Sequence, residues 1–156
     1  MAEVLDAFRR SGLFHGLTGE QLTLVAALAE DLVLDRGEVV VQEGEPGERI
    51  FIVRQGMVEV QVTREEVSDV VAFAPVERIV TLGSGQVFGE MAVLDRGPRS
   101  AIVRCVEDDT RLCAIPGQAL VDLCEENPRI GYMLMRNLAL DLSFKLRHRN
   151  LRVQSR

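Results

Sequence analysis

Histidine and lysine are scarce in this chain of 156 residues, and the scarcity excludes several kinds of site. His15 and His148 lie at opposite ends of the sequence, so they form no cluster that could hold a catalytic metal ion. No Ser/His/Asp grouping or paired acid and base is visible, so we expect no enzyme. Lys145 is the only lysine, and at a net charge of −6 the chain lacks the excess of cations that a nucleic-acid surface needs.

Cysteine is also sparse, and long apolar runs are missing. Three cysteines without C-x-x-C spacing predict free thiols in a reducing compartment rather than a disulfide or a zinc site. Cys105, Cys113 and Cys124 each have apolar neighbours, so we interpret them as small buried hydrophobic residues. No apolar run approaches the ~20 residues that cross a bilayer, and the N-terminus lacks the pattern of a signal peptide. We therefore expect no membrane contact and a cytoplasmic location.

The length suits a single domain over 1–156, because typical domains have about 100–150 residues. The hydrophobic period predicts helices over about 1–34, with a helical pattern from position 4 onward. A first short helix contains Leu5 and Phe8 and ends in a turn near Gly12. Thr18 and Gln21 form a capping-box pattern that predicts a second helix start. The apolar positions of that helix are Leu22, Leu24, Val25, Leu28 and Leu32.

The middle of the chain, 35–116, changes to a period of two that is typical of strands. Glycines and a Pro46-Gly47 pair separate the apolar runs and predict tight turns. Many short strands at this spacing indicate an antiparallel β-roll of jelly-roll type, and with the helices an α+β fold. The predicted strands are 38–42, 50–54, 57–62, 79–82, 101–104 and 111–115, and 65–76 is interpreted as a long hairpin connection.

The last stretch, 117–156, returns to a helical period. One helix is predicted over about 118–126, and Asn127-Pro128 caps a longer one, with proline in its favoured first turn. The longer helix carries one apolar row of Leu134, Leu138, Leu142 and Leu146, and a second row of Met133, Leu140, Phe144 and Leu151. Two interpretations stay open: a wide stripe buried in one domain, or a second row that contacts a twin subunit or another protein.

The segment 88–101, FGEMAVLDRGPRSA, contains the residues with the clearest chemistry. Positions 90–94 suit a short helix, whose first amide N–H groups have no internal partner and favour an anion such as phosphate. Gly89 allows close backbone approach, and Arg99 can return beside the same helix end to bind that phosphate. Glu90 would accept hydrogen bonds from hydroxyl groups such as those of ribose. A phosphate and a hydroxyl on one small ligand indicate a nucleotide, although a Glu90–Arg99 ion pair would also suit the composition.

This segment resembles the phosphate-binding cassette of the cyclic-nucleotide-binding domain family, which includes catabolite-activator-like sensors and protein kinase A regulatory subunits. The matching positions are Phe88, Gly89, Glu90, Met91, Ala92, Pro98, Arg99, Ser100 and Ala101. Val93 stands where the family more often has leucine. The glycine-marked runs at 36–47 and 56–60 also match the family, and the resemblance covers nearly the whole chain.

The resemblance implies a role for each of these residues. Glu90 would bond the ribose 2′-hydroxyl, Arg99 would pair with the cyclic phosphate, and Ser100 would reach the phosphate or a syn guanine. The backbone amides of Gly89, Met91 and Ala92 would help to hold phosphate or sugar oxygens. The resemblance places the base between the roll and the last helix, with expected contacts from Val71, Val80, Val87, Leu146, Arg147 and Arg149.

The resemblance further implies a sensor that binds cyclic AMP and responds by moving its last helix. Cyclic GMP is the alternative ligand, and an interaction module of the same fold without ligand is the alternative function. No cofactor or metal ion is expected. The family's transcription factors continue into a helix-turn-helix, whereas this sequence stops at Arg156, so we expect no nucleic acid to bind this chain alone. A homodimer or a partner protein would use the C-terminal helix.

Overall fold

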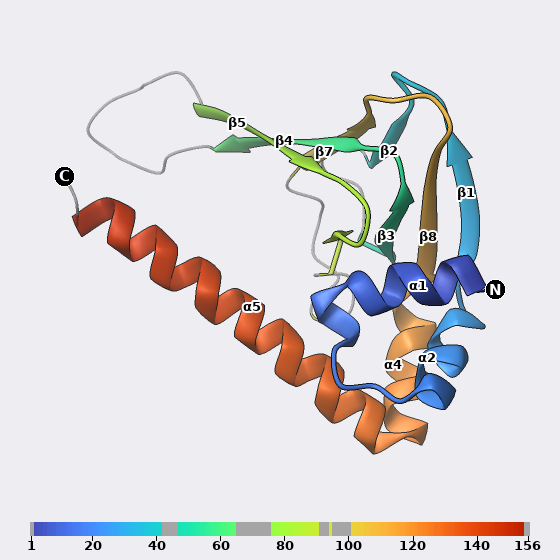
Figure 1. Ribbon diagram of the computed structural model, residues 1–156. Helices are drawn as coiled ribbons and strands as arrows, with labels where there is room; N and C mark the ends of the chain where they lie inside the picture. The colour runs from blue at the N-terminus through green and yellow to red at the C-terminus, as the bar shows by residue number, and fades with distance from the viewer. Residues whose placement is uncertain (1, 42–46, 65–75, 91–93, 95–100, 155–156) are drawn as a thin grey trace.

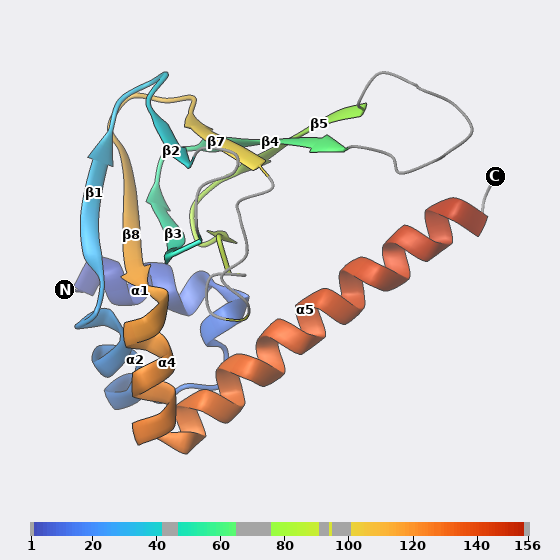
Figure 2. The same ribbon diagram turned by 180° about the vertical axis from the view of Figure 1, so that it is seen from behind.

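Helices at both ends of the chain flank a roll of two four-stranded antiparallel sheets (Figures 1 and 2). The coordinates are a computed structural model that describes residues 2–41, 47–64, 76–90, 94 and 101–154. The arrangement confirms the predicted α+β class, an antiparallel β-roll with N-terminal helices and two C-terminal helices.

The first sheet has the strand order β1-β8-β3-β6, and the second has the order β2-β7-β4-β5. The first contains β1 (Glu30–Leu34), β8 (Thr110–Pro116), β3 (Arg49–Gln55) and β6 (Val87–Phe88). The second contains β2 (Val39–Val41), β7 (Ala101–Cys105), β4 (Val58–Arg64) and β5 (Val76–Leu82). All six predicted strands are confirmed, whereas β1 and β6 were not predicted. Of the predicted connection 65–76, residues 65–75 lie outside the described residues.

Two separate apolar cores explain why β3 reads as a continuous apolar run. Ile50 and Ile52 face the helices and belong to one buried cluster. Phe51 and Val53 point to the opposite face, into a second cluster between the two sheets. Because successive strand residues alternate between faces, a sheet that is covered on both sides needs apolar residues at every position.

The N-terminal segment contains α1 (Ala2–Arg10), the 3-10 turn η1 (Gly12–Phe14) and α2 (Gly19–Ala26). The predicted capping box is confirmed. The Thr18 side chain accepts a hydrogen bond from the Gln21 amide at 3.2 Å, and the Gln21 side chain accepts one from the Thr18 amide at 2.9 Å.

The predicted helical stretch extends too far, because residues 30–34 form β1 rather than the end of α2. Leu28 and Leu32 have helical spacing, but they pack against different cores. Leu32 pairs with Leu112 of β8, so its place is decided by a strand about eighty positions later in the chain. A spacing of four residues suits a helix face and also one face of a strand, and only the partner strand distinguishes them.

Both predicted C-terminal helices are confirmed as α4 (Gly117–Glu126) and α5 (Pro128–Gln154). The two predicted rows of α5, however, do not divide into an inner and an outer row. Met133, Leu134 and Leu138 are buried, whereas the later members of both rows, Leu140, Leu142, Phe144 and Leu146, are 53%, 38%, 61% and 60% exposed. Leu151 lies in the helix, but its side chain lies outside the described residues.

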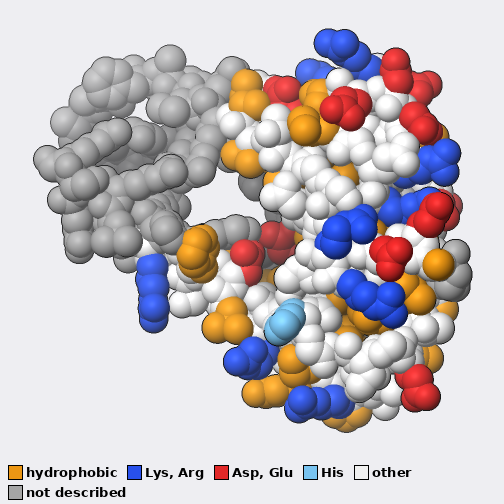
Figure 3. Space-filling model, in the orientation of Figure 1, with side chains coloured by type: hydrophobic (Ala, Val, Ile, Leu, Met, Phe, Trp, Pro, Cys, Tyr) orange, Lys and Arg blue, Asp and Glu red, His pale blue; other side chains and the backbone are white. Residues whose placement is uncertain are grey.

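In its first half α5 has a buried side and an exposed side, since Tyr132 and Met135 are 57% and 38% exposed, whereas the described large apolar side chains from Leu140 to Leu146 are all exposed. Figures 1 and 2 show the reason: α5 begins against the other helices and then leaves the body of the molecule. At a rise of about 1.5 Å per residue, a helix of 27 residues outreaches the small bundle that covers its start. Hydrophobic side chains are visible at the surface along its course in Figure 3. Within the described part of the chain, no helix has the length and apolarity to span a membrane.

Candidate functional site

The segment 88–101 connects the two sheets of the roll. It starts at Phe88, the last residue of β6 in the first sheet, and ends at Ala101, the first residue of β7 in the second. Ala101 pairs with Val62 of β4. Both ends of the segment are therefore held by strand pairing.

The first end is fixed by an aromatic pair. Phe88 is only 6% exposed, and its ring stacks on Phe51 of β3 with centroids 4.8 Å apart and an interplanar angle of 12°. The two residues are also direct partners in the strand register. This contact anchors the backbone immediately before Gly89 and Glu90.

Gly89 turns the backbone sharply at this point. Its φ angle is +77°, in the left-handed region that costs other residues about 1–2 kcal/mol. The requirement for glycine is therefore structural. Glu90 follows in a turn and is partly buried, so its carboxylate is placed directly after the fixed glycine.

Several predicted site residues lie outside the described residues: Val71, Met91, Ala92, Pro98, Arg99 and Ser100. Leu94 is helical and 44% exposed, which agrees with the last position of the predicted short helix over 90–94. Glu90 itself lies in a turn rather than in a helix, so the helix cannot begin as early as predicted.

The structure brings Phe88, Val80 and Ala101 toward the interior of the roll. Val80 of β5 pairs with Val60 of β4, and Val60 packs against the cluster that contains Phe88. Ala101 lies on the same face of the sheet, because its partner is two residues beyond Val60. Val80 remains 36% exposed, so the inner face is only partly covered at this end.

The other predicted base contacts are placed elsewhere. Val87 packs against the cluster between the first sheet and the helices, on the opposite face from Phe88. Leu146 and Arg147 are exposed on the part of α5 beyond the body. Arg149 is in α5, but its side chain lies outside the described residues. The structure therefore brings Val80, but not Val87 or Leu146, to the side on which Phe88 lies.

Comparison with known proteins agrees with this geometry. Residues 32–127 match the family model of the cyclic nucleotide-binding domain. The chain belongs to this family. The match begins within β1 and continues through α4, so it includes nearly all of the roll and the segment 88–101.

Relatives of this cyclic nucleotide-binding domain occur in proteins of several kinds. A candidate potassium channel protein of Rhodopseudomonas palustris is 35% identical over 122 residues, which are 78% of this chain and 27% of that protein. The cyclic AMP receptor protein of Thermus thermophilus is 32% identical over 142 residues, 90% of this chain and 60% of that protein. The cGMP-dependent protein kinase egl-4 of Caenorhabditis briggsae is 32% identical over 108 residues, 67% of this chain and 12% of that protein. This chain therefore spans only part of the length of each.

A solved structure gives the same result for the fold. The crystal structure of the Thermus thermophilus catabolite activator protein matches with a TM-score of 0.75 at 31% identity, over 92% of this chain and 62% of that one. The agreement covers the helices at both ends as well as the roll, because nearly the entire chain is aligned.

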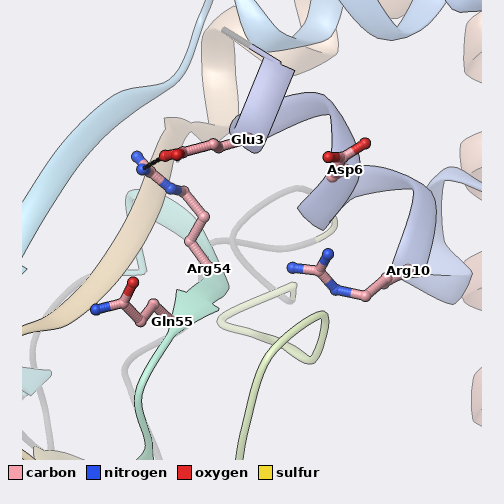
Figure 4. Close-up of a pocket in the computed structure, with 5 residues that line it drawn as sticks. All are labelled: Glu3, Asp6, Arg10, Arg54 and Gln55. Carbon is pink, nitrogen blue, oxygen red and sulfur yellow. Dashed lines mark hydrogen bonds and ion pairs between the residues drawn. The ribbon is translucent and has the colours of Figure 1, made fainter.

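A polar pocket of the cyclic nucleotide-binding domain, whose lining includes none of the described residues of the segment 88–101, was not predicted from the sequence. Figure 4 shows its lining: Glu3, Asp6, Arg10, Arg54 and Gln55. The Arg54 side chain is 11% exposed and donates to Glu3 of α1 at 2.6 Å and to Asp31 of β1 at 3.0 Å. Arg10 donates to Ser84, whose hydroxyl donates to the Arg54 carbonyl. These contacts attach α1 to the first sheet. Because Glu3 and Arg54 are 51 positions apart, no local sequence pattern predicts their ion pair.

The three cysteines are free thiols, as predicted, with Cys105 and Cys113 buried and Cys124 partly buried. Burial raises the pKa of all three thiols, for Cys113 to about 11 with a further contribution from the Asp31 carboxylate. Thiolates are the reactive form, so these cysteines act as packing residues. Among the described residues, no three His, Cys, Asp or Glu side chains are grouped in a way that could hold a metal ion.

Proposed function

We propose that this domain is a cyclic AMP sensor whose ligand is held by the segment 88–101. One observation supports the proposal: Glu90 and Arg99 belong to the same connection between the two sheets, and the strands at both of its ends, β6 and β7, are paired. A carboxylate and a guanidinium on one crossing segment offer an acceptor for hydroxyl groups and a donor fork for phosphate.

Each group of the segment has a distinct task in this proposal. Arg99 pairs with the cyclic phosphate, in charge-assisted hydrogen bonds of roughly 1.5–3 kcal/mol each. Glu90 accepts from the ribose 2′-hydroxyl. The backbone amides of Gly89, Met91 and Ala92 bind the remaining oxygens, as unpaired amides at a helix start do. Val80, on the half-open inner face of the second sheet, contacts the base.

Isothermal titration calorimetry with cyclic AMP tests the proposal. The wild-type domain should bind at micromolar affinity or better. Arg99→Ala should weaken binding by roughly 2–3 kcal/mol, or about 30- to 150-fold, because the phosphate loses its charged partner. Arg104→Ala is the matched control, since Arg104 is an exposed arginine of β7. Absence of heat and of a thermal shift at millimolar cyclic AMP would contradict the proposal.

The same titration addresses an interaction module without ligand, the alternative that shares the fold. In such a module Arg99→Ala would alter stability modestly and would change no binding, because no phosphate depends on the guanidinium. The presence of both Glu90 and Arg99 favours the sensor.

Cyclic GMP is the second candidate ligand, and Ser100 is the residue that favours it. A hydroxyl directly after the arginine can donate to the guanine of a syn nucleotide, although it can equally serve the phosphate. Titration of both nucleotides into wild type and Ser100→Ala separates the two. If the variant loses only cyclic GMP affinity, the preference for cyclic AMP is wrong.

The output of the sensor would pass through α5. Tyr132, Met135, Leu142 and Leu146 are 57%, 38%, 38% and 60% exposed, and their spacing of three, seven and four places them on one side of the helix. A second copy of the domain or another protein would bury this stripe, and ligand-driven movement of α5 would alter that contact. Sedimentation velocity of wild type and Leu142→Glu tests self-association, which the charge should abolish.

The proposal assigns the domain a regulatory task rather than catalysis, in a cytoplasmic setting and without a cofactor of its own. Neither nucleic acid nor a membrane is a proposed partner of this chain. Incubation with cyclic AMP, with and without a chelator, tests the absence of catalysis, because chelator-sensitive hydrolysis of cyclic AMP would identify an enzyme.

A further inference from the structure

A buried asparagine connects the start of α5 with the N-terminal segment. Asn137 is 7% exposed, and its side-chain amide donates to the Leu13 carbonyl at 2.7 Å and to the His15 carbonyl at 2.9 Å. An amide has two N–H donors, so both are used in these two bonds. The acceptors are the carbonyl of Leu13, within η1, and that of His15, the C-cap residue of η1. Asn137 thus satisfies the backbone of a segment more than 120 positions earlier.

One turn earlier on α5, Met133 makes a second contact with the same segment. Gly16 has a φ angle of +88°, and a Cβ added to it would clash with the Cε of Met133. Met133 is 8% exposed. The residues after η1 and the first half of α5 therefore meet at van der Waals distance, beside the hydrogen bonds of Asn137. Figure 1 shows this N-terminal segment passing beside the first turns of α5.

The contact ends at a definite position along α5. Ile130 and Leu134 are each 1% exposed and belong to the same core cluster as Phe8 and Phe14. Leu138 is 5% exposed and is the last buried apolar residue of the helix among the described side chains. Among the described side chains from position 140 onward, the large apolar ones are at least 38% exposed. The helix thus has an embedded half and a projecting half.

We propose that Asn137 is a positioning residue that fastens η1 to the embedded half of α5. The two then move as one body, and the part of α5 that responds to ligand begins after Leu138. The position at which the ligand response begins rests on the proposed function, whereas the attachment of η1 to α5 by Asn137 does not.

The physical reason lies in what a movement would expose. Separation of α5 from η1 before Leu138 would break both hydrogen bonds and leave the amide of Asn137, which is 7% exposed, without these acceptors, which is unfavourable for a buried polar group. Beyond Leu138, side chains such as Leu140 and Leu146 are already 53% and 60% exposed, so a bend of the helix there would expose little additional apolar surface. A bend in α5 is therefore confined to the projecting half.

Hydrogen-exchange mass spectrometry of the full chain without ligand tests the fastening. Asn137→Leu keeps a side chain of similar size and removes both donors. Exchange in 11–17 and in 129–138 should accelerate together, by about tenfold or more, while β3 and β8 keep their wild-type rates. Arg136→Gln, at an exposed neighbouring position of the same helix, is the matched control and should change neither segment.

Two further variants keep the test decisive. Asn137→Asp is nearly isosteric and cannot donate, so it should reproduce the effect if Asn137→Leu fails to fold. Gly16→Ala disturbs the same contact from the other side and should accelerate the same two segments. Unchanged exchange, acceleration of one segment alone, or uniform acceleration that includes β3 and β8 would each refute Asn137 as the fastening residue.

The same experiment with saturating cyclic AMP tests the position of the response. In the wild type, cyclic AMP should change the exchange rates within 139–147 and leave the rates in 11–17 and in 129–138 unchanged. A change that begins within 129–138 would overturn the proposed boundary. If cyclic AMP does not bind, the proposed function fails, whereas the ligand-free comparison of Asn137→Leu with Arg136→Gln still decides the fastening.

Discussion

The stacked pair of Phe51 and Phe88 provides a quantitative test of how the segment 88–101 is anchored. Phe88→Leu keeps an apolar side chain but removes the ring contact, whose centroids are 4.8 Å apart. Apolar replacement with little loss of volume usually costs less than about 1.5 kcal/mol, and an aromatic pair contributes about 0.5–1.5 kcal/mol beyond burial. We therefore expect the free energy of unfolding to fall by about 1–2 kcal/mol.

A double-mutant cycle isolates the ring contact from the lost burial. Urea unfolding of wild type, Phe51→Leu, Phe88→Leu and the double variant should give a coupling of about 0.5–1.5 kcal/mol. Ile52→Val, on the opposite face of β3, is the matched control and should cost about 0.5–1.5 kcal/mol. A coupling indistinguishable from zero would refute the argument that the ring pair anchors this end.

The same variants connect the anchor with ligand binding. If Phe88 orients the backbone of Gly89 and Glu90, cyclic AMP affinity should fall several-fold in Phe88→Leu and remain at the wild-type value in Ile52→Val. Calorimetric titration measures both. Equal losses of affinity in the two variants would mean that general stability, rather than the anchor, controls the site.

Three further predictions concern single residues. Gly89→Ala should reduce the free energy of unfolding by about 1–2 kcal/mol in urea titrations, because φ is +77°, whereas Gly83→Ala should have little effect since the space around Gly83 is open. Thr18→Ala should cost about 1 kcal/mol in the same assay, because α2 loses the side-chain half of its capping box. Burial, and then the Asp31 carboxylate, raises the pKa of the Cys113 thiol from 9.0 to about 11. The neutral thiol therefore makes its full contribution to the free energy of unfolding below pH 9, and this contribution is lost as the pH rises toward 11. Cys113→Ala should flatten the free energy of unfolding over this pH range.

Local patterns in the sequence were sufficient for much of this molecule. The capping box of Thr18 and Gln21 and the proline at the start of α5 act within one helical turn, so they predict helix starts without knowledge of the fold. The alternating runs of the roll likewise predict six strands. The composition of the segment 88–101 allowed either a ligand site or a Glu90–Arg99 ion pair, and the resemblance to the cyclic-nucleotide-binding domain family distinguished them.

Features that depend on distant residues needed the tertiary structure. Leu32 suits a helix by spacing and becomes part of a strand through β8. The rows of α5 look continuous in sequence, but the body of the molecule covers only their first half. Arg54 and Asn137 gave no signal, because their partners lie 51 and more than 120 positions away. Periodicity and helix caps depend on residues that are close in the sequence, so the sequence alone determines them. Burial and long-range polar contacts depend on which surfaces pack together, so only the tertiary structure determines them.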